Sequence, residues 1–259
     1  MSAAAARGSV VVVGLGPGPA ELMTQAARAA LAQATDIIGY GPYVDRVPDV
    51  RADQLRHASD NRVEIDRARH ALRLAVEGRR VAVVSGGDPG VFAMASAVLE
   101  AVEAGEPTWR SLDIRVEPGV TAMLAAAAEA GAPLGGDFCA ISLSDNLKPW
   151  ATIERRLRAA ADADFVIALY NPRSNARPEQ LGAALALLRS LKAPQTVVLL
   201  VRAAGTTEVR RITTTLADVD PTAVDMRTLV LIGASTTRLI AREGAAAPWV
   251  YTPRREEAP

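Results

Sequence analysis

Cysteine, histidine and aromatic residues are scarce in this sequence. It holds one cysteine and two histidines among 259 residues, and only 4% of the residues are aromatic. A single cysteine, Cys139, excludes an internal disulfide bond and favours a reducing compartment. The two histidines, His57 and His70, do not stand with other ligands at the spacing of a metal site, so we expect no metal. Because 49% of the residues are nonetheless hydrophobic, the sequence predicts a core of small side chains in close-packed α/β layers.

Net charge and long apolar runs are missing as well. The 29 lysines and arginines balance the 29 aspartates and glutamates. A neutral chain has no long-range field that would draw it to nucleic acid or to an anionic membrane, so any anionic ligand must be met by locally placed cations. No window approaches the roughly 20 apolar residues of a membrane span, and the stretch MSAAAARG lacks the apolar segment of a signal peptide. We therefore expect a soluble, cytoplasmic protein.

What the sequence does contain is an alternation of short β-rich runs and helical patterns, which is typical of α/β proteins. In the first half it predicts strands at 10–13, 36–38, 81–85 and 114–117, and helices at 24–31, 63–77, 92–104 and 121–130. In the second half it predicts strands at 138–143, 165–170, 196–201, 209–214 and 229–232, and helices at 151–161 and 178–191. The stretch 131–137 has the glycine and proline content of a linker. The predicted fold is therefore two α/β domains, 1–133 and 134–259, with a frayed tail at 254–259.

The first predicted strand ends in a glycine loop, VVVGLGPGP at residues 11–19. A dinucleotide-binding loop has the spacing GxGxxG, whereas this one has GxGxG. Pro17 and Pro19 also remove backbone N–H donors that a pyrophosphate would need. Asp36 begins the second strand, although the fingerprint requires an acid at its end. These departures disfavour a nicotinamide or flavin site and leave open a tight turn without a ligand.

Two further glycine loops follow predicted strands, SGGDPGVF at 85–92 and EPGVTAM at 117–123. Gly86 and Gly87 allow a ligand to approach the backbone closely. Asp88 presents a carboxylate at the carboxyl end of a strand, where open α/β sheets bind ligands. Alternatively, Asp88 caps the next helix, with Pro89 at its first position. Three such loops in one domain predict one shared crevice.

Taken together, GLGPGP (14–19), GGDPGVF (86–92) and PGVTA (118–122) resemble the tetrapyrrole methylase family of S-adenosylmethionine-dependent methyltransferases. The stretches at 39–47, 142–150, 168–175 and 202–215 are similar to the ring-contracting members of that family in cobalamin biosynthesis. The resemblance covers roughly residues 9 to 252. It implies two α/β domains with the cofactor in the cleft between them, usually in a homodimer.

The activity that the resemblance implies is methyl transfer from S-adenosylmethionine to C17 of precorrin-3B, an anionic tetrapyrrole. Ring contraction to precorrin-4 accompanies the transfer, and S-adenosylhomocysteine is the other product. The corresponding reaction on cobalt-factor III remains an alternative, although the lack of a fused domain and of a cysteine cluster favours the metal-free substrate. Two alternatives come from other classes. The GxGxG spacing argues against a nicotinamide oxidoreductase, and the presence of all three loops with Asp88 argues against a non-catalytic tetrapyrrole carrier.

The resemblance also implies site residues. S-adenosylmethionine carries a sulfonium cation and no phosphate, so proline-containing glycine loops suit it. The implied cofactor contacts are Pro17, Gly86, Gly87, Asp88, Val91, Phe92, Thr121, Ala122, Tyr170, Asn171, Gly205 and Ala234.

The implied substrate is rimmed by carboxylates, which arginine binds well. The main candidates for substrate contacts are Arg46, Lys148, Arg173 and Arg210, with Arg202 and Arg238 as further ones. Ring contraction needs proton transfer, for which Asp88, Tyr40 and Tyr43 are the first candidates, followed by Asp45, Ser85, Asp145 and Glu208. Tyr40 and Tyr43 could equally pack the edge of the domain.

Overall fold

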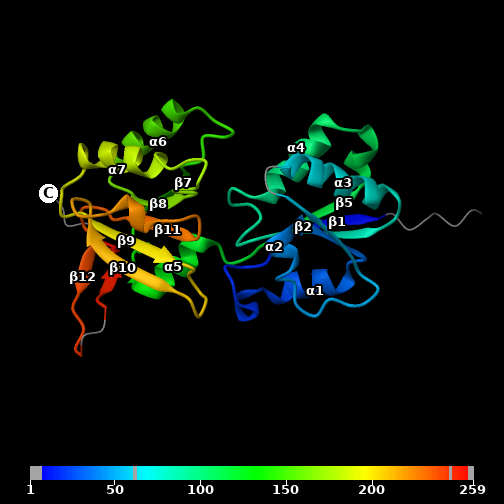
Figure 1. Ribbon diagram of the computed structural model, residues 1–259, viewed down its shortest axis with the longest axis horizontal. Helices are drawn as coiled ribbons and strands as arrows, with labels where there is room; N and C mark the ends of the chain where they lie inside the picture. The colour runs from blue at the N-terminus through cyan, green and yellow to red at the C-terminus, as the bar shows by residue number, and fades with distance from the viewer. Residues whose placement is uncertain (1–7, 61–62, 245–246, 256–259) are drawn as a thin grey trace, which may run out of the picture. The chain divides into compact units, whose positions relative to one another are not determined.

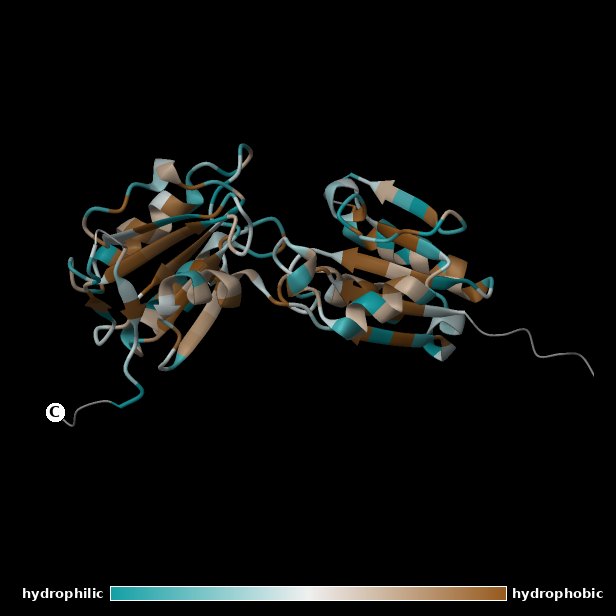
Figure 2. Ribbon diagram, turned by 90° about the horizontal axis from the view of Figure 1, so that it is seen from below, coloured by the Kyte–Doolittle hydropathy of each residue, from teal (hydrophilic) through white to brown (hydrophobic). Residues whose placement is uncertain are grey.

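The computed structural model describes residues 8–60, 63–244 and 247–255 (Figure 1). Residues 1–7 and 256–259, which include most of the predicted tail, lie outside the described residues. By its contacts the chain divides after Ala122 into two compact units, called unit 1 and unit 2 below. In each unit the most hydrophobic segments are the inner strands of a sheet (Figure 2).

Unit 1 is built on a five-stranded sheet in the order β3-β2-β4-β1-β5. All its neighbouring strands pair in parallel. Its central strands are almost fully buried, as expected for a parallel sheet that is covered on both faces. The strands are β1 Ser9–Gly14, β2 Asp36–Tyr40, β3 Leu55–Ser59, β4 Arg80–Ser85 and β5 Asp113–Glu117.

Helices cover both faces of this sheet (Figure 1). Val10 and Val12 of β1 pack toward α3 and α4, whereas Val11 and Val13 pack toward α1 and α2. Helix α1 follows β1 and helix α4 follows β4, so the chain passes to opposite faces of the sheet after these two neighbouring strands. Such a switch point opens a crevice at the carboxyl ends of the strands. The helices are α1 Gln25–Gln33, α2 Gly41–Val44, α3 Glu64–Val76 and α4 Met94–Ala104, with short 3₁₀ turns η1 Ala20–Leu22 and η2 Pro107–Ser111.

Unit 2 contains a mixed five-stranded sheet in the order β10-β9-β11-β8-β7. Strands β7 and β8 are parallel, whereas β11 runs antiparallel to both β8 and β9, and β10 runs antiparallel to β9. Helices α6 and α7 pack on one face through leucine and isoleucine side chains. The elements are β7 Phe138–Ser142, α6 Trp150–Asp162, β8 Val166–Tyr170, α7 Gln180–Arg189, β9 Val197–Arg202, β10 Arg210–Thr215, η3 Pro221–Ala223 and β11 Thr228–Ile232.

A small second sheet completes unit 2. It joins β12 Arg238–Ile240, β13 Trp249–Tyr251 and β6 Gly131–Ala132. The start of the predicted linker is therefore a strand, which pairs in parallel with β13. Helix α5, Ala122–Ala130, leads directly into it, so the compact units divide before the predicted boundary at residue 133. Where the domains end as folding units stays a prediction.

The predicted α/β architecture is confirmed, since all nine predicted strands and all six predicted helices are present. The predicted core of small side chains is found in unit 1, where alanines of α3 and α4 are buried, whereas the core of unit 2 is mainly leucine and isoleucine. Four strands, β3, β6, β12 and β13, and the one-turn helix α2 were not predicted from the sequence.

Candidate active site

The first and second glycine loops of unit 1 are joined by their backbones. Gly16 donates its N–H to the carbonyl of Gly87 over 3.1 Å, and Gly87 donates to the carbonyl of Gly16 over 2.9 Å. Both residues have positive φ angles, +69° and +67°, a conformation that glycine adopts without strain. The loops after β1 and β4 therefore form one rigid pair at the switch point.

The third glycine loop packs directly on this pair. A Cβ atom on Gly119 would collide with the carbonyl oxygen of Gly87, and one on Gly14 would lie 2.7 Å from the nitrogen of Gly119. Only glycines allow three backbones to approach so closely. The structure thus brings the three loops together at the carboxyl edge of the sheet, as the sequence predicted.

Asp88 ties the second loop to the third. Its Oδ1 accepts the N–H of Gly90 over 2.8 Å, and its Oδ2 accepts the N–H of Gly119 over 3.0 Å. Helix α4 begins only at Met94, and no side chain caps it. The alternative that Asp88 caps this helix is therefore wrong. Both carboxylate oxygens bind loop backbone, and a direct contact with cofactor stays a prediction.

Tyr40 and Tyr43 lie at the same edge, at the end of β2 and in α2. Their rings meet edge to face, with centroids 5.5 Å apart. A Cβ on Gly86 would lie 2.8 Å from the ring of Tyr43, so this ring packs against the second loop. Arg46 donates through Nη2 to the carbonyls of Gly16 and Gly18, over 3.0 and 3.4 Å. Its guanidinium is thereby engaged by the first loop, and burial lowers its pKa.

The other residues predicted in unit 1 differ in exposure. Phe92 has a φ of +53° and an exposed fraction of 51%, so its ring reaches solvent. Thr121 is buried directly before α5, whereas Pro17, Val91 and Ala122 are half-buried. Ser85 is buried at the end of β4, and Asp45 is exposed.

In unit 2 the predicted contacts Tyr170, Asn171 and Gly205 share one edge, where the parallel strands β8 and β9 end. Asn171 has a φ of +51°. Its Nδ2 donates to Ser142 Oγ over 2.9 Å, and its carbonyl accepts from Arg177 over 3.1 Å. Gly205, with a φ of +77°, donates its N–H to Glu129 over 3.1 Å. Buried Arg177 and half-buried Glu129 were missed, because nothing in their local sequence separates them from surface charges.

Ala234 lies apart from these residues. Strand β11 runs antiparallel to β8, and Ile232 at its carboxyl end pairs with Ile167 near the start of β8. The loop that holds Ala234 therefore lies at the opposite edge of the sheet from Asn171. Ala234 was predicted from the family motif, which does not reveal that β11 runs antiparallel to β8.

Four of the candidate cations, Lys148, Arg173, Arg202 and Arg210, share the edge of Asn171. Arg202 is paired with Asp225 over 2.7 Å. Lys148 donates to the carbonyl of Ser144 over 3.1 Å, and burial, together with Arg156, lowers its pKa. The side chain of Arg210 is exposed and has no hydrogen bond or ion pair within the described part of the chain. Arg238 lies in the separate small sheet.

The remaining acid–base candidates of unit 2 are engaged by neighbours. Asp145 accepts a hydrogen bond from Gln180 over 3.0 Å. Glu208 pairs with Arg227 over 2.9 Å. These contacts do not identify either residue as a proton donor for the predicted reaction.

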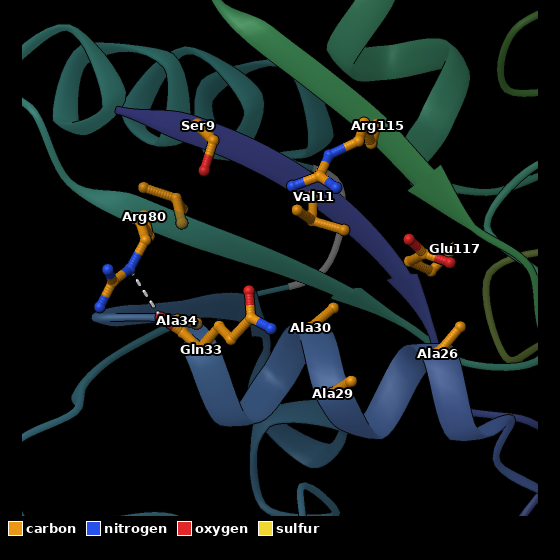
Figure 3. Close-up of a pocket in the computed structure, with 11 residues that line it drawn as sticks. Ser9, Val11, Ala26, Ala29, Ala30, Gln33, Ala34, Arg80, Arg115 and Glu117 are labelled. Atoms are coloured by element: carbon orange, nitrogen blue, oxygen red, sulfur yellow. Dashed lines mark hydrogen bonds between the residues drawn. The ribbon is translucent and has the colours of Figure 1, made fainter. Parts of the chain in front are cut away.

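A cavity of about 250 Å³ lies elsewhere in unit 1, between helix α1 and strands β1 and β5 (Figure 3). Ala26, Ala29 and Ala30 of α1 form its floor, and Arg115 and Glu117 of β5 border it. None of the loop glycines lines it. This groove is therefore separate from the glycine loops.

The glycine loops suit a ligand with a positive charge and no phosphate. Pro17 and Pro19 have no backbone N–H donors, and the carbonyl of Pro19 accepts the N–H of Leu22 over 3.1 Å. A Cβ on Gly87 would meet no atom nearer than 3.7 Å, so the backbone there is open to close approach. S-adenosylmethionine fits this donor set better than a dinucleotide does.

Residues 9–220 match the model of the tetrapyrrole (corrin/porphyrin) methylases. The chain belongs to this family of methyltransferases. It is 55% identical over 247 residues to the precorrin-3B C(17)-methyltransferase of Sinorhizobium sp, covering 95% of this chain and 96% of that protein. The crystal structure of the methyltransferase CobJ superimposes with a TM-score of 0.90 at 56% identity, covering 95% of this chain and 100% of the other.

Two further relatives and one more distant structure complete the comparison. The cobalamin biosynthesis protein CobIJ of Mycobacterium tuberculosis is 50% identical, and the match spans 48% of its length and 96% of this chain. The probable cobalt-factor III C(17)-methyltransferase of Salmonella typhimurium is 43% identical over 87% of this chain and 92% of that protein. A Thermus thermophilus uroporphyrin-III C-methyl transferase complexed with S-adenyl homocysteine shares the fold, with a TM-score of 0.66 at 23% identity, covering 87% of this chain and 92% of the other. Among the described residues, no helix has the length and apolar character needed to cross a membrane.

Proposed function

We propose that this chain transfers a methyl group from S-adenosylmethionine to C17 of precorrin-3B and contracts the ring to precorrin-4 in cobalamin biosynthesis. The observation that carries the proposal is 55% identity to the Sinorhizobium enzyme along almost the full length of both chains. The three joined glycine loops support it, because they offer a backbone surface rather than a phosphate cradle.

In this proposal the protein works mainly by positioning. When bound, S-adenosylmethionine supplies a methyl group that is already electrophilic, and the electron-rich macrocycle supplies the carbon nucleophile. Holding two reactants in line can remove about 7–11 kcal/mol from a barrier. The glycine loops of unit 1 and Asn171 of unit 2 hold the methyl donor. Lys148, Arg173 and Arg210 hold carboxylates of the substrate.

Ring contraction also requires proton transfer. Tyr40 and Tyr43 are proposed for it, because both lie beside the glycine loops and one of them contacts Gly86. A phenol at this place can donate or accept a proton within the site. Asp88 is the weaker choice, since loop N–H groups occupy both of its oxygens.

The alternative substrate is cobalt-factor III. Identity to the Salmonella protein named for that substrate is 43%, against 55% for the precorrin-3B enzyme, which favours the metal-free substrate. The test is to incubate the enzyme and S-adenosylmethionine with each tetrapyrrole and to identify the products by mass spectrometry. We expect precorrin-4 from precorrin-3B. Turnover of the cobalt complex alone would overturn the proposal.

The homodimer and the cytoplasmic location stay predictions, from the family resemblance and from the single cysteine respectively. Light scattering coupled to size exclusion tests the first, with twice the 27.2 kDa chain mass as the expected result.

A further inference from the structure

The segment that joins β2 to α2 and continues to Arg46 contacts two of the three glycine loops. Tyr43 packs its ring against Gly86 of the second loop. Arg46 donates to two carbonyls of the first loop, those of Gly16 and Gly18. The guanidinium of Arg46 also lies 5.8 Å from the centre of the Tyr43 ring. The two side chains thus form one connected pair, called the Tyr43–Arg46 brace below, that contacts both loops.

The first loop depends on such an outside donor. Prolines stand at positions 17 and 19 and cannot donate backbone hydrogen bonds. The carbonyls of Gly16 and Gly18 flank Pro17 on either side, so a group that binds both fixes the orientation of the Pro17 ring. Both bonds come from one nitrogen, Nη2, whose two N–H bonds are fixed in the plane of the guanidinium, whereas an ammonium group sits on a flexible stem.

The environment of Arg46 is typical of an arginine that stabilises a loop through hydrogen bonds. Its side chain is half-buried, and within the described residues it forms no ion pair with a carboxylate. Burial of a charged group is costly unless its donors are satisfied. Two loop carbonyls and an aromatic face offset that cost here, and the Nη2 donors that bind these carbonyls are not available to a substrate carboxylate.

We infer that Arg46 is a positioning residue that holds the Pro17 turn against the methyl donor, rather than a contact for the tetrapyrrole carboxylates. This inference rests on the proposed function. It replaces the expectation from the sequence, which grouped Arg46 with the substrate-binding cations. It also separates Arg46 from Arg210, whose guanidinium is exposed and unpaired within the described residues.

The test is calorimetric titration of S-adenosylhomocysteine into the wild type, Arg46→Met and Arg46→Lys. Steady-state assays then vary each substrate in turn. We expect Arg46→Met to weaken S-adenosylhomocysteine binding at least about tenfold and to raise the KM for S-adenosylmethionine, with the KM for precorrin-3B unchanged. Arg46→Lys should give an intermediate loss, because an ammonium on a flexible stem keeps the positive charge but is held less firmly between the two carbonyls.

The matched control is Arg28→Met. Arg28 also donates to a backbone carbonyl, that of Ala20, but outside the glycine loops. The affinity of the Arg28→Met variant for S-adenosylhomocysteine should stay within about twofold of the wild type. If Arg46→Met does not fold, Arg46→Lys carries the same test.

Two results would overturn the inference. Unchanged S-adenosylhomocysteine affinity in the Arg46 variants is one of them. A raised KM for precorrin-3B with an unchanged KM for S-adenosylmethionine is the other, since it would restore Arg46 to the substrate site. Failure of the wild type itself to bind S-adenosylhomocysteine would instead count against the proposed function.

Discussion

At the scale of single residues, one carboxylate holds two glycine loops in register. Asp88 accepts N–H groups from Gly90 and Gly119. Hydrogen bonds to a charged acceptor are worth about 1.5–3 kcal/mol each, and an unpaired N–H that remains buried costs a similar amount. Asp88 therefore shapes the candidate site whether or not it contacts the ligand.

Replacing Asp88 by alanine should lower the affinity for S-adenosylhomocysteine at least about tenfold, or roughly 1.4 kcal/mol. The reason is that the third loop loses its link to the second. Calorimetry on Asp88→Ala and Asp88→Asn measures the effect, and the asparagine variant, which keeps one acceptor oxygen, should lose less. Wild-type affinity in both variants would show that the link made by Asp88 between the two loops is not needed for binding.

The close approach of the three loops makes a second test possible. An added methyl group at Gly119 collides with the backbone of Gly87, so Gly119→Ala should force the loops apart. Overpacking of this kind typically costs about 1–3 kcal/mol. Urea denaturation should show that loss of stability, and S-adenosylhomocysteine affinity should fall with it.

Gly182→Ala is the matched control for that substitution. Gly182 lies within α7, and a Cβ atom there would meet nothing within 4 Å. Alanine should stabilise the helix by about 0.5–1 kcal/mol relative to glycine. Equal effects of the two substitutions would contradict the packing argument.

Asp36 carries a third prediction at this scale, far from the glycine loops. Its carboxylate is 1% exposed and accepts from Arg79 over 2.7 Å, Thr35 over 2.7 Å and His57 over 2.9 Å. Burial alone would raise the pKa of Asp36, but these donors outweigh it and hold the pKa below its ordinary value. A carboxyl whose pKa is lowered by folding stabilises the protein above its unfolded pKa, about 3.9, and loses that contribution as the pH falls through the folded value.

Asp36→Asn should therefore lower the free energy of unfolding by about 1.5–3 kcal/mol at neutral pH. The difference from the wild type should shrink as the pH falls below about 4, where the Asp36 carboxylate of the wild type becomes protonated. Denaturant titrations across this range measure it. A difference that does not depend on pH would mean that packing, not charge, accounts for the role of Asp36.

At the scale of elements, the strands that the sequence predicted are those with continuous apolar runs. The missed strand β3 reads LRHAS and is largely exposed at the edge of its sheet, so it carries no apolar signal. Strands β6, β12 and β13 are two or three residues long and exist through pairing with distant segments. A strand's pairing partner far along the chain cannot be predicted from the local sequence pattern. These strands therefore could not be predicted.

The direction of each strand in its sheet could not be predicted from the sequence pattern either. The three loops of unit 1 could be grouped from the sequence because its strands are all parallel and their carboxyl ends share one edge. In unit 2, β11 is antiparallel, and a periodicity of two residues is the same in both directions. This is why Asn171 and Gly205 share an edge while Ala234 does not.

At the scale of the whole molecule, the balance of charge leaves recognition to local groups. The chain has no net charge, and many of its arginines are engaged by carbonyls or carboxylates, as Arg46 and Arg202 are. Few cations at the Asn171 edge of unit 2 are free to meet substrate. Affinity for a polyanionic tetrapyrrole should therefore depend on a small number of residues, Arg210 and Arg173 among them.

The last prediction concerns both compact units at once. If the proposed function holds, one ligand should protect backbone amides in the glycine loops of unit 1, residues 85–92 and 117–121. It should also protect amides in unit 2, at Tyr170, Asn171 and residues 203–206. Hydrogen exchange measured with and without saturating S-adenosylhomocysteine tests this. The loop of Ala234 should exchange at the same rate in both samples, because it lies at the other edge of its sheet.

NADH provides the control, because Pro17 and Pro19 in the first loop remove N–H donors that a pyrophosphate requires. It should change no amide. Protection confined to unit 1 would remove Asn171 and Gly205 from the site and leave the glycine loops as the whole of it. Protection at Ala234 as well would mean that the ligand contacts both edges of the unit 2 sheet, which a single small molecule cannot do without a change in structure.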